Sequence, residues 1–320
     1  MPGIVFTLFL GLCWALGQLF RDLTAWTAFL FYIPSPALAG MALVATAWAV
    51  WRRKRLPLWA RFGPPLLAAA ALGASWGENP RFLVRASTLE LAPNGRAVRL
   101  VHWNVCRGCL GWNEALTALQ AWDADLLVLS EYPKRMDVRA TAAALGPTYQ
   151  GRRFGTLALF ARNARTGVES LLNEYELEVH RITWERMGSA EPVRLRILAV
   201  DVVASPRIPR DPQLLRIQQS IARETPDLVL GDFNAPRRSW RLQRLPDGYH
   251  DAYDLAGAGW AGTWPSPFPL WAIDHVIAGP RIRVRSYRLP FSWRSDHRAQ
   301  LVELEVRDAA PSTPRSGGGP

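Results

Sequence analysis

The sequence is poor in lysine and in cysteine, and both scarcities limit what the protein can be. Lys54 and Lys134 are its only lysines, so the formal net charge of +11 rests on arginines spread along the chain. This charge favours anionic partners such as phosphates or acidic lipid surfaces. Without a long basic run or a series of stacking aromatics, it is a weak sign of nucleic-acid binding. The three cysteines cannot by themselves complete a zinc site of four ligands.

Charge is also missing from two long stretches near the N-terminus, Ile4 to Phe20 and Leu23 to Trp51. Each is long enough for the roughly 20 residues that cross a hydrocarbon core. A cleaved signal peptide fits poorly, because no basic residue precedes Ile4 and a second apolar stretch follows. A third apolar segment, Leu56 to Trp76, is long enough to span the membrane if Arg61 extends its side chain to the interface. We therefore expect a membrane anchor over residues 1–78, with about three helices near 4–20, 24–51 and 58–76.

The basic cluster Arg52-Arg53-Lys54-Arg55 predicts the orientation of this anchor, because such clusters stay in the cytoplasm. Three spans then place the rest of the chain outside, whereas two would leave it inside. We favour three, since two leave Pro64–Trp76 as an exposed apolar strip; the alternative is that the strip packs against the soluble part. The prediction is a multi-pass protein of the bacterial cytoplasmic (inner) membrane, with its soluble domain on the periplasmic or extracellular side.

Beyond the anchor the sequence alternates between strand and helix patterns. Residues 79–96 are polar and irregular and read as a linker, 97–308 as one domain, and 309–320, rich in Ser, Pro and Gly, as a disordered tail. Helical spacing occurs over 112–122 and 214–221. Strands are predicted at 98–105, 126–129, 157–160, 195–203, 228–230, 273–277, 284–289 and 301–306.

Polar side chains follow several of these strands. Leu228–Asn234 reads Leu-Val-Leu-Gly-Asp-Phe-Asn, an apolar run that ends in an acid and an amide two residues apart and therefore on one face. A carboxylate and a carboxamide suit a divalent metal and a phosphate. Alone, the segment could equally be a turn. The other strand ends are Asn104, Ser130-Glu131, Ile273-Asp274-His275-Val276 and Ser295-Asp296-His297-Arg298.

The order and spacing of these five blocks resemble the endonuclease/exonuclease/phosphatase superfamily, whose members are metal-dependent phosphoesterases. The resemblance covers Val98 to Val306, and the joint match is much more specific than any single block. It implies an α+β fold, the four-layer αββα sandwich of the DNase-I-like type, preceded here by the transmembrane helices.

The resemblance also implies roles for seven residues. Glu131 and Asn104 would hold the divalent metal, Mg²⁺ with Mn²⁺ as the alternative, and Asp296 would lie close to the same ion. Asp232 would orient the attacking water, and Asn234 would donate a hydrogen bond to the phosphoryl oxygen. His297 would act as a base or as a transition-state donor, with Asp274 accepting from its other ring nitrogen.

One departure from the family pattern concerns the leaving group. Many members carry a histidine in a His-Leu-x-Ser-Pro-like segment; here the text is Asp201-Val202-Val203-Ala204-Ser205-Pro206, with Val202 in the histidine's place. Asp201 is adjacent, but neighbouring strand residues face opposite ways, so it replaces the histidine only if the register slips. Protonation of the leaving group stays unassigned, which slightly favours a phosphoanhydride over an alkyl phosphodiester.

Other polar residues near the blocks have open roles. His275 points away from the face of Asp274 and reads as structural, whereas His102 shares the face of Asn104 and could line the site or support it. Cys106 and Cys109 form a Cys-x-x-Cys; if the domain lies outside the membrane, a disulfide that braces this loop is the simplest interpretation.

The segment from Trp260 to Trp271 contains three tryptophans, Phe268 and three prolines. It either packs over the sheet edge or contacts a lipid chain or the bilayer surface, which tryptophan favours.

Together these features predict a membrane-anchored metal-dependent hydrolase of a phosphoester or phosphoanhydride. The arrangement resembles the membrane-anchored branch that includes a teicoplanin-resistance-associated protein, which suggests a lipid-linked phosphate as substrate. The alternatives are an anchored nuclease acting on DNA or RNA, and a family-derived membrane scaffold without catalysis. The sequence leaves open the substrate, the number of metals and the oligomeric state.

Overall fold

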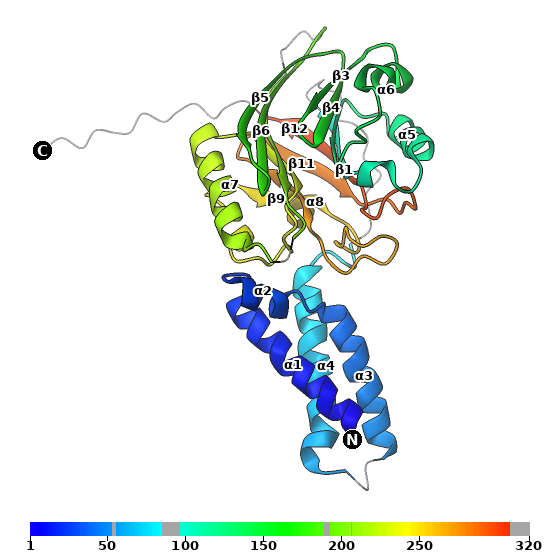
Figure 1. Cartoon of the computed structure of the whole chain (residues 1–320), viewed down its shortest axis with the longest axis vertical. Coiled ribbons are helices and arrows are strands. Elements are labelled where there is room, and N and C mark those ends of the chain that lie inside the picture. The colour runs from blue at the N-terminus through cyan, green and yellow to red at the C-terminus, as the bar shows by residue number, and fades with distance from the viewer. Residues whose placement is uncertain (53–55, 85–96, 189–192, 206, 308–320) are drawn as a thin grey trace, which may run out of the picture.

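The computed structural model describes residues 1–52, 56–84, 97–188, 193–205 and 207–307. Figure 1 shows two parts, a stalk of N-terminal helices and a larger domain of strands and helices at one end of it. Most of the expected linker and the whole expected tail, 309–320, lie outside the described residues.

The stalk consists of α1 (Pro2–Phe20), α2 (Ala25–Phe31), α3 (Ser35–Trp51) and α4 (Leu58–Glu78). The short helix α2 lies beside the domain, and the N-terminus lies at the far end (Figure 1). Thr24 begins α2 with a capping box, and Pro34 separates α2 from α3, which are bent by 53°.

The stalk corrects the expected number of spans. By length and composition, α1 alone could cross a membrane, and α2 with α3 could do so only if the bent pair counts as one span. The third expected segment does form a helix, α4, but α4 contains Pro64 and Pro65 as well as Arg61 and is not one of the candidate spans. Among the described residues there are thus one or two candidate spans, not the three predicted.

Buried hydrogen bonds join the stalk to the domain. Asp22, only 1% exposed, accepts from the backbone N–H of Trp240 at 2.8 Å. Asn79, at the end of α4, accepts from the N–H of Ala261 at 2.8 Å. The two parts therefore meet in a defined arrangement.

The domain contains two six-stranded sheets. The first has the order β11 (Ile282–Arg288), β12 (Gln300–Val306), β1 (Ala97–Asn104), β2 (Leu126–Ser130), β4 (Leu157–Arg162) and β3 (Tyr149–Phe154). The second has the order β5 (Ala164–Asn173), β6 (Leu177–Arg186), β7 (Arg194–Val202), β8 (Leu228–Asp232), β10 (Asp274–Ala278) and β9 (His250–Asp251).

The sheets pack face to face, and helices cover their outer faces. Side chains such as Leu126 and Leu228 share the core between the sheets. On the outside, α5 (Trp112–Ala121) and α6 (Val138–Leu145) cover the first sheet, and α7 (Arg210–Glu224) covers the second. A short helix, α8 (Ala252–Ala256), and the 3₁₀ turns Cys106–Gly108 and Leu242–Arg244 complete the domain. The expected αββα sandwich of the α+β class is confirmed.

The register of the central strands brings their polar ends together. In the first sheet β1 runs parallel to β2, which sets Asn104 beside Ser130. In the second, Asp232 of β8 lies between Asp201 of parallel β7 and Asp274 of antiparallel β10. The ends of strands from both sheets therefore meet at one edge of the sandwich.

Gly231 allows β8 to lie this close to β7. Its φ is +151°, and a Cβ built on it would lie 1.8 Å from the carbonyl oxygen of Val200. A backbone atom cannot move aside as the end of a side chain can, so the strand end before Asp232 requires glycine.

We expect Gly231→Ala to lower the free energy of unfolding by about 3 kcal/mol or more, measured by denaturant unfolding of the full chain. Gly259 is the matched control, because its φ is +75° but nothing lies within 4 Å of a Cβ built there. Its replacement by alanine should cost about 1 kcal/mol, the conformational strain alone. Equal losses at the two positions would contradict the steric explanation.

Candidate functional site

The turn after β8 holds two of the expected site residues. Asp232 is buried, and its Oδ1 accepts from the backbone N–H of Asn234 at 2.9 Å. Asn234 has a positive φ of 46°, and its Nδ2 donates to the carbonyl oxygen of Val202 at 2.7 Å. One amide hydrogen of Asn234 thus ties the turn to β7 and the second is left for a ligand.

His297 and Asp274 form a buried pair beside this turn. The Nδ1 of His297 lies 2.8 Å from Oδ2 of Asp274, and its Nε2 lies 4.0 Å from Oδ2 of Asp232. The carbonyl of His297 accepts from the indole N–H of Trp103 at 2.9 Å, which fixes its backbone. The expected pairing of His297 with Asp274 is present, and Nε2 is directed toward Asp232.

Burial and charge shift the pKa of all three groups. Burial, together with the Asp274 carboxylate, raises the pKa of Asp232 to about 7. Burial would lower the pKa of His297, but Asp274 outweighs it and raises that pKa to about 10. Burial likewise opposes ionisation of Asp274, yet the imidazolium holds its pKa below the ordinary value. The pair is therefore an ion pair at neutral pH, and Asp232 can exchange a proton there.

Asn104 connects the carboxylates of Glu131 and Asp232. Its Nδ2 donates to Asp232 at 2.9 Å and lies 3.5 Å from Oε1 of Glu131, while its Oδ1 accepts from the N–H of Cys106 at 2.9 Å. In this arrangement Asn104 orients the two carboxylates. Its direct contact with a metal stays a prediction.

The loop after β1 and the turn at Glu131 have an unusual backbone. Cys106, Arg107 and Glu131 all have φ between 47° and 52°. The backbone N–H of Arg107 donates to the carbonyl of Glu131 at 2.9 Å. The side-chain Nε of Arg107 lies 3.1 Å from Oε2 of Glu131. Left-handed residues of this kind persist where surrounding contacts determine them, often at functional sites.

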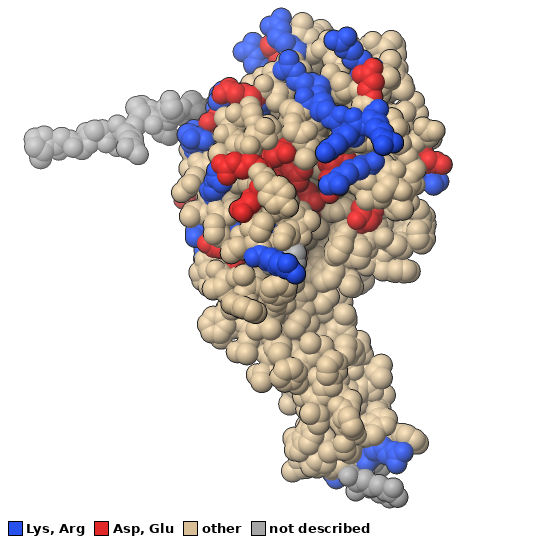
Figure 2. Space-filling model, in the orientation of Figure 1, with Lys and Arg blue, Asp and Glu red and all other residues tan. Residues whose placement is uncertain are grey.

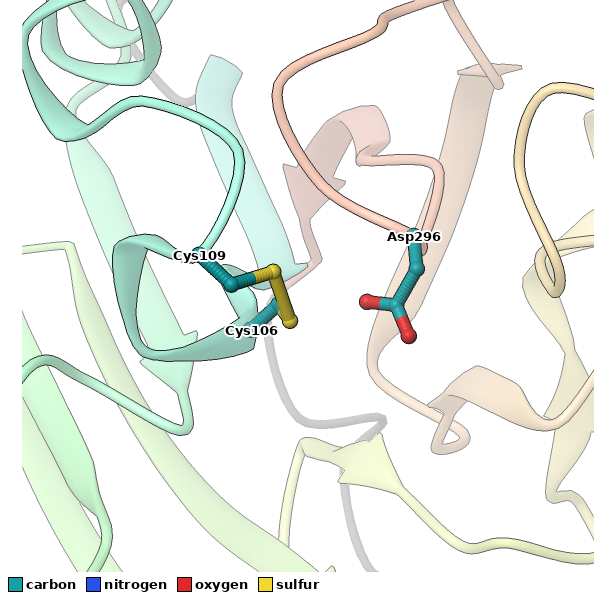
Figure 3. Close-up of side chains that lie close together, drawn as sticks. All are labelled: Cys106, Cys109 and Asp296. Atoms are coloured by element: carbon teal, nitrogen blue, oxygen red, sulfur yellow. A yellow bond between two sulfur atoms is a disulfide. The ribbon is translucent and has the colours of Figure 1, made fainter.

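A disulfide joins Cys106 to Cys109, as the sequence suggested for a domain outside the membrane. Figure 3 shows the two sulfur atoms facing the carboxylate of Asp296, which comes from the loop before β12. Because the sulfurs are bonded to each other, they are not thiolate ligands for a metal. The disulfide instead braces the loop that contacts Asn104 and Glu131.

Asp296 is held by the aromatic loop. Its Oδ2 accepts from the indole N–H of Trp264 at 3.1 Å, and its carbonyl accepts from the N–H of Ser266 at 2.6 Å. The hydroxyl of Ser295 donates to the carbonyl of Asn104 at 2.7 Å and fixes this loop to the end of β1.

A cavity of about 440 Å³ brings these groups together. On one side it is lined by Glu131, Asp232, Asn234, Asp296 and His297. The remaining lining residues are Tyr32, Ala204, Arg210, Pro236, Trp264, Trp271 and Ile273.

The donor set of the cavity fits a hard divalent cation. Glu131, Asp232 and Asp296 are all carboxylates that line it, and Mg²⁺ binds through one or two carboxylates plus substrate phosphate. Asp232, Asp274 and His297 also lie within 4.8 Å of one another, but the hydrogen bond of His297 Nδ1 to Asp274 makes this group a proton-handling set.

The structure corrects the expectation that Asp201, next to Val202, faces away from the site. The side chain of Val202 belongs to the core under α7, so it does not face the site. Asp201 pairs with Asp232 in parallel register and therefore shares its face, and it accepts a hydrogen bond from Thr156. Burial and the nearby Asp232 raise the pKa of Asp201 well above its ordinary value.

The other two histidines near the blocks support the site from behind. His102 is fully buried between Gln300 and Ser130, at 2.8 and 3.0 Å, and does not line the cavity. His275 faces the other way, as expected, with Nδ1 3.0 Å from Asp251.

Comparison with models of known protein families agrees with the resemblance seen in the sequence. The model of the Endonuclease/Exonuclease/phosphatase family matches residues 101–297, well over half of the chain. The chain belongs to this family.

Solved structures show the fold of the same family. An Endonuclease/Exonuclease/phosphatase family protein from Bacteroides thetaiotaomicron is 18% identical, covers 67% of this chain and 98% of its own, and has a TM-score of 0.52. The human nocturnin catalytic domain is 18% identical, with 70% and 99% covered and a TM-score of 0.53. A mannosyl-6-phosphatase from Bacteroides thetaiotaomicron is 16% identical, with 65% and 99% covered and a TM-score of 0.50. No curated protein sequence matches the chain.

Sequence reasoning missed two residues that line the cavity of this family member. Tyr32 comes from the stalk and Arg210 from the start of α7, and neither belongs to a family block. The position of Arg210 next to the Ser-Pro segment was a signal, because a helix that follows a site strand begins near the site. No local signal marked Tyr32, whose contact depends on how the stalk meets the domain.

The Asp251 network behind the site has a defined pH dependence. Burial opposes ionisation of Asp251, but Arg237 and His275 outweigh it and lower its pKa to about 2. Its unfolded pKa is about 3.9, so the contribution to stability is present above that pH and is lost as pH falls toward about 2.

We expect Asp251→Asn to cost about 2 kcal/mol of unfolding free energy at pH 7, with the difference from the unaltered protein shrinking between about pH 4 and pH 2. Denaturant unfolding across that range measures it. Exposed Asp247 provides the control, with no measurable loss on Asp247→Asn. A difference that stays constant down to pH 2 would contradict the role assigned to this carboxylate.

Proposed function

We propose that the protein is a divalent-metal-dependent hydrolase of a phosphoester or phosphoanhydride, with Mg²⁺ as the metal and Mn²⁺ as the alternative. Members of its family are phosphoester hydrolases, which supports hydrolysis in general. The observation that carries the proposal is the meeting of Glu131, Asp232 and Asp296 with the His297–Asp274 pair at one cavity. Such a group combines ligands for a hard cation with a proton-handling pair.

The residues of the chain divide the chemistry among them. Asp232 holds the attacking water and takes up its proton, for which a pKa of about 7 is suited. Asn234 donates its free amide hydrogen to the phosphoryl oxygen, and His297, held as an imidazolium by Asp274, stabilises the charge that develops there. A bound Mg²⁺ would supply Lewis acidity at the phosphate, with Glu131 and Asp296 as its ligands.

Asp201 is our candidate for the group that protonates the leaving group. It lies on the face of Asp232, and burial together with the neighbouring Asp232 carboxylate raises its pKa well above the ordinary value. A carboxyl group that binds a proton can donate it to the leaving group, the step for which many family members carry a histidine in the Ser-Pro segment.

The packing of the stalk supports a membrane location. Its buried positions are mostly small residues, whereas large apolar side chains point outward, the pattern of helices packed together in lipid. Figure 2 shows a stalk face without charge between the domain and the basic group at its far end. The buried small residues include Thr7, Gly11, Gly17, Ala28, Ser35, Ala39, Ala42, Ala45, Ala49, Ala60, Ala68, Ala71 and Ser75; the exposed apolar ones include Phe6, Phe9, Leu12, Leu19, Val44 and Leu66.

The position of the basic end supports an orientation. Helix α3 ends away from the domain (Figure 1), and Arg52, with which the basic cluster of the sequence begins, follows it directly. Basic clusters stay in the cytoplasm. The domain would then lie on the periplasmic or extracellular side, which requires that α4, although not itself a candidate span, returns across the bilayer beside α3. Such an oxidising location suits the Cys106–Cys109 disulfide.

Exposed aromatics on the two loops that supply Trp264 and Asp296 to the cavity support a lipid-linked phosphate as the substrate. Phe268 is 80% exposed on the loop of Trp264, and Phe291 and Trp293 are 59% and 61% exposed on the loop of Asp296. Aromatic side chains of this kind insert at bilayer surfaces. We further propose, from the resemblance seen in the sequence, that the chain belongs to the membrane-anchored branch that includes the teicoplanin-resistance-associated protein.

Fusion of an alkaline-phosphatase reporter after Arg307 tests the location. We expect reporter activity, because that enzyme matures only in an oxidising compartment, and we expect a cytoplasmic reporter fused at the same point to be silent. The reverse result would place the domain in the cytoplasm and contradict the orientation.

Purified full-length protein should hydrolyse a prenyl pyrophosphate or a phospholipid in the presence of Mg²⁺, and EDTA should stop the reaction. Asp232→Asn should lower kcat at least about 100-fold in a protein that still unfolds cooperatively, whereas Asp247→Asn should leave kcat unchanged. Plasmid DNA belongs in the same assay. Turnover of DNA alone would favour the nuclease, and no turnover of any substrate would favour the scaffold.

A further inference from the structure

The cavity of the site is also lined by apolar side chains that the proposed chemistry does not use. Trp264 and Trp271 line it with ring centroids 5.4 Å apart, together with Pro236 and Ile273. Tyr32 of the stalk lines the same cavity. Carboxylates and an apolar wall therefore share one space of about 440 Å³.

Tyr32 is fixed at this position by the junction of the two parts. Its carbonyl accepts from the indole N–H of Trp271 at 3.1 Å, and the buried bond of Asp22 to Trp240 holds the turn before α2. The hydrogen bond between its backbone and the aromatic loop therefore holds Tyr32 at the cavity.

The side chain of Tyr32 lies next to the one basic side chain of the cavity. Among the described residues, Arg210 is the only arginine or lysine that lines it. Arg210 is 3% exposed and donates to the carbonyls of Asn234 and Ser205, at 2.8 and 3.3 Å, and to Gln213 at 3.0 Å. The Tyr32 hydroxyl faces its guanidinium without a well-formed hydrogen bond.

The lining thus changes from anion-binding to apolar within one cavity. Arg210 and the amide of Asn234 suit a phosphate. Tyr32, Trp264 and Trp271 suit an apolar group bonded to it. A nucleic-acid strand would need a row of cations for successive phosphates, and one arginine does not provide it.

We propose that this cavity binds the phosphate together with the first apolar unit of an amphiphilic phosphoester, and that Tyr32 of the stalk is the residue that selects for that unit. The inference rests on the proposed function, since it assumes that the phosphate binds beside Asp232. It adds that the stalk supplies part of the substrate site.

Binding of alkylphosphonates tests the inference without turnover. Ethyl-, butyl- and hexylphosphonate share one anionic group and differ only in the length of the apolar chain. With full-length protein and Mg²⁺, titration calorimetry should show a Kd that falls about three- to fourfold for each methylene buried against the apolar wall.

Three variants locate the effect. Tyr32→Ala should remove most of the dependence on chain length and leave binding of ethylphosphonate close to that of the unaltered protein, which also shows that the site is folded. Tyr32→Phe should keep the dependence, because only the hydroxyl is lost. Trp26→Ala is the control on the same helix, since Trp26 is 83% exposed, and it should behave as the unaltered protein.

The outcomes separate this inference from the proposed function. A Kd independent of chain length, or an unchanged dependence in Tyr32→Ala, would overturn the inference even if the protein hydrolyses phosphoesters. Absence of hydrolysis would count against the proposed function alone, because the phosphonate series still reports on the cavity.

Discussion

The hydrogen bond from Asn104 to Asp232 joins the two sheets at the edge where the site lies. Asn104 ends β1 of the first sheet and Asp232 ends β8 of the second, and their side-chain atoms are 2.9 Å apart. The same amide reaches Glu131, and the backbone of Asn104 accepts from Ser295. Because one residue contacts three loops, the relative positions of the carboxylates depend on the packing of the sandwich as a whole.

That packing also sets the electrostatics of the site. Asp232, Asp274 and His297 are all buried at this edge, so each charge depends strongly on its neighbours. The imidazolium of His297 is stable because Asp274 lies 2.8 Å from its Nδ1. Asp232 lies farther from the ring, 4.0 Å from Nε2, and keeps a pKa of about 7. Small differences in distance thus separate an ion pair from a proton acceptor.

The sequence predicted much of this arrangement, because the site residues lie at strand ends within short blocks. Their order identified the sandwich, and the pairing of Asp274 with His297 followed from it. Local patterns could not supply the face on which Asp201 lies, since alternation along a strand tells which residues share a face but not which face that is. The pairing of Asp201 with Asp232 decided it.

The helices of the stalk lie close to the predicted ranges, but the number of candidate spans was wrong for a related reason. Apolar content suggested three equal spans. The structure instead breaks the second segment at Pro34 and forms an alanine-rich α4, and how these helices pack on one another is not visible in the sequence. Small residues lower the hydropathy of a helix and at the same time allow close contact, so composition alone undervalues a helix of this kind. The contact of Tyr32 with the cavity joins segments that are distant in the sequence and has no local signature.

The hydrogen bond between Trp271 and the carbonyl of Tyr32 has a practical consequence for soluble versions of the protein. A fragment that begins at β1 would keep both sheets and all seven residues expected from the family blocks. It would nevertheless lack one wall of its own cavity and leave the indole of Trp271 without its acceptor. Inhibitor screens or substrate profiles obtained on such a fragment would describe a wider and more polar cavity than that of the full chain.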